Sequence, residues 1–339
     1  NHVHYFVYYF GENVLRPPLP ISYPWVMTVV TVPAAILIAA GFGFVHAGLQ
    51  WDPVDWAKRW RRRLTEGSLP RRGQGDPRGT GLLLAMNLLF PIALISQPST
   101  PIFGGTKHWM PAMPFLAIFA GAGIALAARL LSEAALPAGE NWTARAARGS
   151  AAALLAASAT LPAVYATAHI HPFGTSYYNE FIGSIRGAAD HRMFRQFWGY
   201  AARQSFPWLN EHAEKNGRVW THNTTGYAWW HYHRAKLVRQ DLHQAGIGGS
   251  DYGLFHHQKA FSRQQMKVWN KYETFAPAHV VSQEGVPLLS LYRRPRLLEK
   301  TTAQKADPPK PPESPESGTA DAGSQRGPKA TDAGSTSGD

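Results

Sequence analysis

The sequence of 339 residues contains no cysteine, which excludes disulfide bonds, thiol catalysis and cysteine-ligated metal. It also lacks a phosphate-binding P-loop, a dinucleotide-binding glycine fingerprint and a Gly-x-Ser-x-Gly nucleophile motif. The first residue is Asn1, and the opening twenty residues carry neither a basic n-region nor a small-residue cleavage site, so they do not form a signal peptide. We therefore expect the chain to be a fragment whose N-terminal portion lies upstream.

Acidic and basic residues are absent from several long apolar runs. A bilayer core of roughly 30 Å is crossed by about 20 helical residues. The predicted spans lie near residues 26–47, 80–96, 109–128 and 150–168. Four buried helices of a large soluble protein are the competing interpretation, but runs of this length without charge are rare in soluble cores. The glycine and alanine of these runs favour close helix–helix packing, and "GFGFVHAG" at 41–48 is then a packing stretch rather than a nucleotide loop.

Basic residues predict which side of the membrane each loop faces. The formal net charge is +12, and the loop after the first predicted span is rich in Lys and Arg: Lys58, Arg59, Arg61, Arg62, Arg63, Arg71, Arg72 and Arg78. Such a short loop belongs on the cytoplasmic side, and its Trp-containing part is expected to lie on anionic headgroups. A nucleic-acid-binding patch is the competing interpretation of this loop. The predicted spans on both sides of it favour a role in orienting the protein in the membrane instead, so no nucleic-acid partner is predicted. The loop at 97–109 and everything from about 169 then lie outside.

The expected fold is an α-helical integral membrane protein followed by a small extracytoplasmic α/β domain and a disordered tail. The predicted divisions are an extracytoplasmic aromatic loop at 1–24, a transmembrane region at 25–169, the α/β domain at 170–295 and the tail at 296–339. Within the α/β domain we expect helices at 194–213 and 260–272 and strands at 217–222, 278–283 and 287–294. Glu284, Gly285 and Val286 are expected to form a hairpin turn between the last two strands. The tail has mixed charge and no apolar periodicity.

Lys107 and His108 follow two glycines in the stretch "GGTKHW" on the predicted outer face. A lysine beside open backbone at a headgroup boundary suits a phosphate, because it offers a point charge and free N–H donors. The alternative is an interfacial lysine that pairs with lipid phosphate.

The histidines raise a metal hypothesis, because His2 and His4, His169 and His171, and His231 and His233 form three His-x-His pairs. Residues i and i+2 of a strand share a face and could ligate zinc or copper. No HExxH motif or carboxylate spacing completes such a site, so no metal site and no cofactor are predicted, and a divalent cation stays open.

The stretch "HPFGTSYYNEFIG" at 171–183 follows the last predicted span and contains Tyr177, Tyr178, Asn179 and Glu180. Tyrosines commonly anchor at the membrane surface, so we expect this stretch to be a hinge into the outer domain. Contact with substrate is the alternative function of these residues.

The stretch "GGTKHWMPAMPFLAIFAGAG" resembles the late transmembrane region of polytopic GT-C glycosyltransferases of glycosyltransferase family 39. This group includes protein O-mannosyltransferases and lipid A aminoarabinose transferases. The resemblance is carried by a basic–aromatic pair before a proline-containing helix start: Lys107, His108, Trp109, Pro111 and Pro114. Residues 8–33 and 171–183 are similar to the corresponding parts of bacterial members, so the resemblance covers about residues 1–295.

The resemblance implies inverting transfer of a hexosyl or pentosyl group from a polyprenyl-phosphate donor to an unknown acceptor on the outer face of a bacterial inner membrane. The family's catalytic carboxylate is expected upstream of residue 1, so the catalytic residues are unknown and the fragment alone is expected to be inactive. Lys107 and His108 are the implied phosphate contacts, and the implied sugar or acceptor contacts are Glu12, Tyr177, Tyr178, Asn179 and Glu180. A non-enzymatic membrane scaffold or sensor subunit with an extracytoplasmic α/β domain is the alternative, and metal handling is a third hypothesis.

Overall fold

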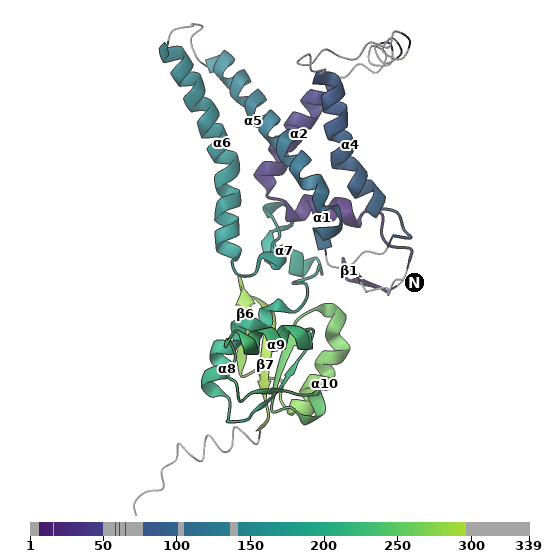
Figure 1. Cartoon of the computed structure of the whole chain (residues 1–339), viewed down its shortest axis with the longest axis vertical. Helices are drawn as coiled ribbons and strands as arrows, with labels where there is room; N and C mark the ends of the chain where they lie inside the picture. Colours follow the sequence, from purple (N-terminus) through teal and green to yellow (C-terminus); the bar gives the residue numbers. More distant parts are fainter. Residues whose placement is uncertain are drawn as a thin grey trace, which may run out of the picture. The chain divides into compact units, whose positions relative to one another are not determined.

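The computed structural model describes residues 7–15, 17–49, 58, 61, 65, 77–100, 105–135 and 142–295. The tail predicted at 296–339, the histidine pair at 2 and 4, and most of the basic loop therefore lie outside the described residues. The described residues belong to one compact unit, which contains an apolar helical part and a smaller sheet domain (Figure 1).

The described residues of the helical part form five α-helices and one 3-10 helix. They are α1 (Tyr23–Thr31), α2 (Ala34–Leu49), α4 (Pro77–Ile95), η1 (Gly105–Ala112), α5 (Met113–Ala135) and α6 (Trp142–Ile170). Each of the four predicted spans falls on one or two of these helices.

Two of these segments are long and apolar enough to cross a membrane, Gly105–Ala134 and Trp142–Ile170, and the bent pair α1 and α2 adds a third if it counts as one span. The apolar part of α4, Gly79–Ile95, is shorter. Among the described residues the count is thus two or three rather than the four expected.

A sharp bend interrupts the predicted span at 26–47. The axes of α1 and α2 differ by 115°. Pro33 has no amide hydrogen to donate and disfavours helical geometry in the residue before it, and Val32 is accordingly extended, with φ −96° and ψ 138°. The uncharged run is helical on both sides of this residue, but it does not form one straight helix.

Glycines allow α2 and α5 to pack backbone against backbone. A Cβ atom placed on Gly43 would lie 2.0 Å from the carbonyl oxygen of Phe119, and one on Gly123 would lie 1.9 Å from that of Ala39. The rings of Phe44 and Phe119 pack edge to face beside this contact. The predicted use of glycine for close packing is confirmed for this helix pair.

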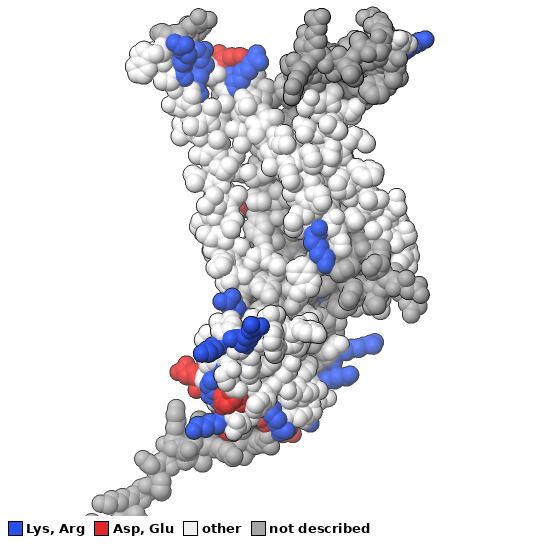
Figure 2. Space-filling model, in the orientation of Figure 1, with Lys and Arg blue, Asp and Glu red and all other residues white. Residues whose placement is uncertain are grey.

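Many large apolar side chains of the helices point outward. Phe42 on α2 is 61% exposed and Leu154 on α6 is 71% exposed. Figure 2 shows a largely uncharged surface along the helices, with Lys and Arg gathered where α5 ends and α6 begins; Arg129 and Arg145 belong to these two helices. A long, uncharged and outward-facing apolar surface is compatible with a lipid environment, and it is unusual for a protein surrounded by water.

The sheet domain has five strands in the order β4-β3-β5-β7-β6. The strands are β3 (Arg218–Thr221), β4 (His243–Gln244), β5 (Tyr252–His256), β6 (His279–Gln283) and β7 (Val286–Arg293). The first three in this order pair in parallel, and β7 joins them antiparallel and pairs with β6 as a hairpin. The accompanying helices are α7 (Ser184–Asp190), α8 (Phe206–His212), α9 (Gly226–Arg234) and α10 (Ser262–Tyr272).

Strand β7 contributes three leucines to the sheet core. Leu288, Leu289 and Leu291 are fully buried, as expected for a strand covered on both faces. The predicted strands at 217–222, 278–283 and 287–294 are confirmed within one residue at their ends. The turn between β6 and β7 is a two-residue loop in which Glu284 and Gly285 both have positive φ, the pattern of a tight hairpin, and this prediction is confirmed as well.

The predicted helix at 194–213 is wrong in its first half. Trp198 and Gly199 have φ angles of 60° and 63°, which an α-helix does not permit. Gly199 is required there, because a Cβ atom would lie 2.1 Å from the carbonyl oxygen of Asn223. Helical structure begins only with a 3-10 turn at Tyr200–Ser205 and continues as α8. Helix α10 agrees with the helix predicted at 260–272.

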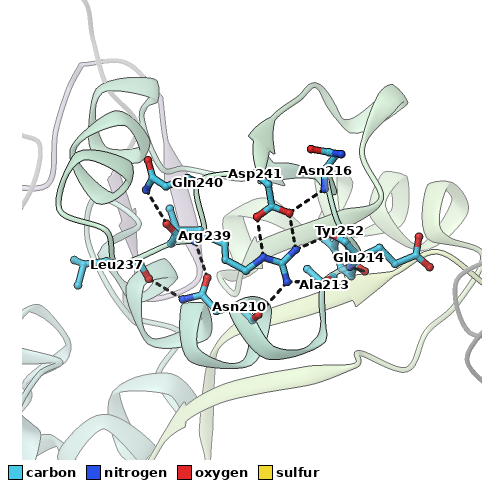
Figure 3. Close-up of polar contacts among 10 residues, drawn as sticks. Asn210, Ala213, Glu214, Asn216, Leu237, Arg239, Gln240, Asp241 and Tyr252 are labelled. Atoms are coloured by element: carbon cyan, nitrogen blue, oxygen red, sulfur yellow. Dashed lines mark hydrogen bonds and ion pairs between the residues drawn. The ribbon is translucent and has the colours of Figure 1, made fainter.

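Arg239 ties the end of α8 to the loop before β4 (Figure 3). Its guanidinium forms a two-pronged ion pair with Asp241, with both N···O distances 2.8 Å. It also donates to the backbone carbonyl oxygens of Asn210, Ala213 and Glu214, which lie in and just after the last turn of α8. A cation at this position satisfies carbonyl groups that a helix leaves unpaired at its C-terminus.

The predicted aromatic loop at 1–24 contains a short hairpin instead of irregular chain. Strands β1 (Val7–Tyr9) and β2 (Glu12–Val14) pair antiparallel. Gly11 in the turn has φ 87°, and its amide donates to the carbonyl oxygen of Arg192 just after α7.

Candidate functional site

A cavity of about 240 Å³ lies where η1 meets the chain that follows α6. It brings together the two stretches that the sequence placed on the outer face. The walls come from Gly105, Thr106 and Lys107 on one side and from Gly174, Thr175, Tyr177 and Tyr178 on the other, closed by Met27, Thr31, Met110, Phe197 and Trp198. We call this space the lysine cavity.

The ammonium group of Lys107 is the charged group at the wall of the lysine cavity. Its Nζ atom lies 5.2 Å from the ring centre of Trp198, a cation–π distance. Gly105 brings the backbone close to the cavity, since its φ is 70° and a Cβ atom placed on it would lie 3.2 Å from the ring of Phe197. Both features disfavour a side chain at this position. The site thus places the lysine beside a glycine whose backbone packs closely against Phe197.

A second cavity of about 340 Å³ lies at the end of α6. It is lined by Tyr165, His169, Glu180, Ser184 and Glu284, and it shares Tyr177 and Tyr178 with the lysine cavity. We call it the glutamate cavity. Two adjacent tyrosines therefore form the common wall between a space with a cation and a space with two carboxylates.

The two shared tyrosines differ in their hydrogen bonding. Tyr178 is buried and its hydroxyl donates to the carbonyl oxygen of Phe194 at 2.7 Å. The hydroxyl oxygen of Tyr177 is buried and has no hydrogen-bond partner among the described residues. Burial, with a smaller contribution from the charge of Glu180, raises the pKa of Tyr177 to about 12, so its hydroxyl stays protonated at neutral pH. Tyr177 is therefore the shared residue whose hydroxyl is not held by a hydrogen bond within the described residues.

Asn179 holds the bend between α1 and α2. It is 1% exposed, and its side-chain amide donates to the carbonyl oxygens of Val29 and Val32, both at 2.6 Å. Its backbone amide donates to the carbonyl oxygen of Val30 at 2.8 Å. These are carbonyl groups of the kind that the end of a helix leaves unpaired. The structure thus gives Asn179 a structural role at the bend, and it lines neither cavity.

The remaining candidates lie apart from the shared wall. Glu12 is exposed on β2 and lines neither cavity, and His108 is half-buried in η1 beside Lys107 but does not line the lysine cavity. Trp109 is buried and donates from its indole nitrogen to the Oγ1 atom of Thr28, which anchors η1 to α1.

The two histidine pairs that lie within the described residues do not come together as a metal centre. His231 and His233 lie on a helix, where residues two apart point in different directions, and His171 is exposed after α6. Within the ranges that the structure describes, no group of three or more His, Asp or Glu side chains is placed to hold a metal ion.

A separate group of histidines is buried beside the sheet. His256 is fully buried at the end of β5, its Nδ1 bonds to the carbonyl oxygen of His222, and His257 bonds through Nε2 to the hydroxyl of Ser290 at 2.7 Å. Burial lowers the pKa of His222 and of His257 to about 4 and that of His256 to about 3. These histidines are neutral parts of the fold at physiological pH.

Sequence reasoning missed Trp198 and Glu284 as cavity residues. The helix predicted at 194–213 placed Trp198 in its interior, and Glu284 was predicted only as part of a turn. The available signal was compositional: a large aromatic residue before Gly199 and an acidic residue at a hairpin tip that the sequence placed on the outer face.

Comparison of the chain with protein-family models, with curated proteins and with solved structures gave no match.

Proposed function

We propose that the chain is part of a membrane-embedded glycosyltransferase that transfers a sugar from a polyprenyl-phosphate donor to an acceptor on the outer face of a bacterial inner membrane. The observation that carries the proposal is the lysine cavity at the end of a helix long and apolar enough to span a bilayer. A phosphate at the headgroup level would meet a cation and aromatic walls there.

The charges of the helical part support an outer position for this cavity. Lys107 precedes α5, whereas Arg129 lies near the other end of the same helix and Arg145 and Arg148 lie at the start of α6. Arginines between two spans favour the cytoplasmic side, so the opposite end of α5 belongs outside. In this arrangement the sheet domain, which follows α6, is outside as well.

The lysine supplies the chemistry expected at the donor phosphate. Transfer of the sugar leaves negative charge on the phosphate oxygens, and a fixed cation stabilises charge that develops as the bond breaks. The general base is assigned to none of the described residues. Tyr177 and Glu180 remain the candidates for contact with the sugar or the acceptor.

The test is binding of a polyprenyl phosphate to the chain in lipid nanodiscs, followed by native mass spectrometry. We expect Lys107→Ala to weaken binding at least about tenfold, because a charge-assisted contact to phosphate is removed. The matched control is Lys215→Ala, which removes an exposed lysine after α8. Equal affinities of the two variants would contradict the proposal.

The same binding measurement distinguishes the glycosyltransferase proposal from the scaffold or sensor hypothesis. A non-enzymatic subunit would bind polyprenyl phosphate no better than it binds a bulk anionic phospholipid of equal charge. Its affinity would also be insensitive to Lys107.

A further inference from the structure

The glutamate cavity has a carboxylate held in place from three elements. Glu284 projects from the β6–β7 turn, its Oε2 accepts a hydrogen bond from the hydroxyl of Ser184 at 2.8 Å, and its Oε1 lies 3.4 Å from Nε2 of His169. Arg186 donates to the backbone carbonyl oxygen of Glu284 and so holds the turn itself. The carboxylate is therefore positioned before any ligand arrives, which lowers the entropy cost of binding.

An aromatic face borders the same cavity. The rings of Tyr165 and His169, one turn apart on α6, are stacked with their centres 5.6 Å apart and their planes 12° apart. Tyr165 is 69% exposed although it is large and lies at the edge of a cavity. A flat, exposed ring beside fixed polar groups is a surface on which an apolar ring face can rest.

These two features favour one class of ligand. Two carboxylates, Glu180 and Glu284, accept hydrogen bonds from hydroxyl groups and repel phosphate, whereas the cation that attracts phosphate lies across the tyrosine wall in the lysine cavity. A ring with one apolar face and several hydroxyl groups matches the aromatic face and the acceptors together.

We propose that the glutamate cavity binds a neutral sugar ring, with Tyr165 as the stacking face and Glu284 as the acceptor for its hydroxyl groups. This inference rests on the proposed function for the role of that sugar as the group transferred or as its acceptor. The two cavities then hold the two ends of one reaction, the lipid phosphate beside Lys107 and the sugar beside Glu284.

The experiment uses the full chain in nanodiscs and a panel of methyl glycosides of neutral pentoses and hexoses, with binding followed by saturation-transfer difference NMR. Glu284→Gln keeps an oxygen that accepts from Ser184, and the backbone contact with Arg186 is unaffected, so the turn is preserved. We expect at least one glycoside to bind the natural chain and its affinity to fall about tenfold in Glu284→Gln, or about 1.4 kcal/mol. Tyr165→Ala removes an exposed ring and is expected to weaken binding of the same glycoside.

One variant serves as the control. Glu211→Gln neutralises an exposed glutamate on α8 and is expected to leave glycoside binding unchanged. Equal binding by Glu284→Gln and Glu211→Gln would overturn the inference, and so would a panel in which no neutral glycoside binds or in which only an amino sugar does. Glycoside binding that depends on Glu284, without any polyprenyl-phosphate binding, would uphold this inference while refuting the proposed function.

Discussion

The helical part and the sheet domain differ in which side chains face inward. Helices α2 and α5 meet through Gly43 and Gly123, while large side chains such as Phe42 point away from the protein. In the sheet domain the large side chains point inward, and Leu288 and Leu291 are fully buried. The sheet domain can thus be stabilised by burial of large side chains away from water, whereas the outward-facing apolar side chains of the helical part are compatible with an apolar environment around it.

The candidate site lies where these two kinds of packing meet. The lysine cavity takes residues from α1, from η1 and from the chain after α6, and Asn179 bonds that chain to the bend after α1.

Acid should unfold the sheet domain first. His222, His256 and His257 have lowered pKa values because they are buried, with Arg195 close to His257 and His222 close to His256. Their contribution to stability is fully present above the unfolded pKa near 6.5 and is lost as the pH falls toward 4, because only the unfolded chain takes up the protons. Between pH 7 and pH 5 we expect a loss of about 2 kcal/mol from each of the three histidines, because all three folded pKa values lie below 5.

Chemical unfolding in detergent, followed by near-UV circular dichroism at several pH values, measures this loss. His257→Gln should flatten the dependence, whereas His231→Gln, at an exposed position on α9, should not. A stability that is flat between pH 7 and pH 5 would contradict the neutral buried state of these histidines.

Asn179→Asp should loosen the junction of the two regions. The aspartate side chain has nearly the same shape as asparagine. Its carboxylate, however, cannot donate to the carbonyl oxygens of Val29 and Val32 and is repelled by them. A buried unpaired charge of this kind costs about 3 kcal/mol. Thermal unfolding monitored by tryptophan fluorescence provides the measurement, with Asn270→Asp on the exposed side of α10 as the control. Equal midpoints for the two variants would show that the contact contributes nothing.

Gly43→Ala should separate α2 from α5. The added methyl group would overlap the carbonyl oxygen of Phe119, and a backbone contact cannot be relieved by a change of rotamer. We expect a loss of about 2–3 kcal/mol. Gly41→Ala, two residues away on the same helix with nothing within 4 Å, should be neutral or stabilising by up to about 1 kcal/mol. Resistance to denaturation in detergent measures the difference in stability between Gly43→Ala and Gly41→Ala. A similar response of both variants would refute the glycine contact.

Arg239→Met should weaken only the sheet domain. The substitution leaves the carbonyl oxygens at the end of α8 without their donor and removes the partner that lowers the pKa of Asp241. Because the ion pair is partly exposed, we expect a loss of about 2 kcal/mol. Hydrogen exchange of the amides of α8 measures it. Arg234→Met, which removes an exposed cation over the ring of Trp230, is the control and should cost less than about 1 kcal/mol.

Local patterns in the sequence predicted the apolar helices and part of the sheet domain, but not strands β4 and β5, helices α7 and α9 or the contacts that join the elements. Uncharged runs located the long helices, and the Glu284–Gly285 turn between two apolar segments located the hairpin. Pro33 was visible in the first run, but the carbonyl groups that the bend exposes are paired by Asn179, about 150 residues away. Gly199 was visible too, but its left-handed geometry follows from the close approach of Asn223.

The candidate site likewise combines residues that the sequence predicted with residues that only the fold brings together. The motif around Lys107 and the stretch 171–183 were predicted to share a face, and they line one cavity. Trp198 and Glu284 joined the site only through the fold, because one lies at an unexpected break in a helix and the other at a hairpin tip. Asn179 resembled a substrate contact in sequence, but its polar atoms bond to the backbone of the helical part.

The central claim, that α5 and α6 cross a bilayer with the sheet domain outside, is tested most directly by cysteine labelling. The natural sequence has no cysteine, and Gly149 on α6 and Gly248 in the sheet domain both have room for a side chain, with nothing within 4 Å. In intact cells, with the outer membrane permeabilised, a membrane-impermeant maleimide should label Gly248→Cys but should label Gly149→Cys only after the inner membrane is opened. Equal labelling of both positions before that step would contradict the account.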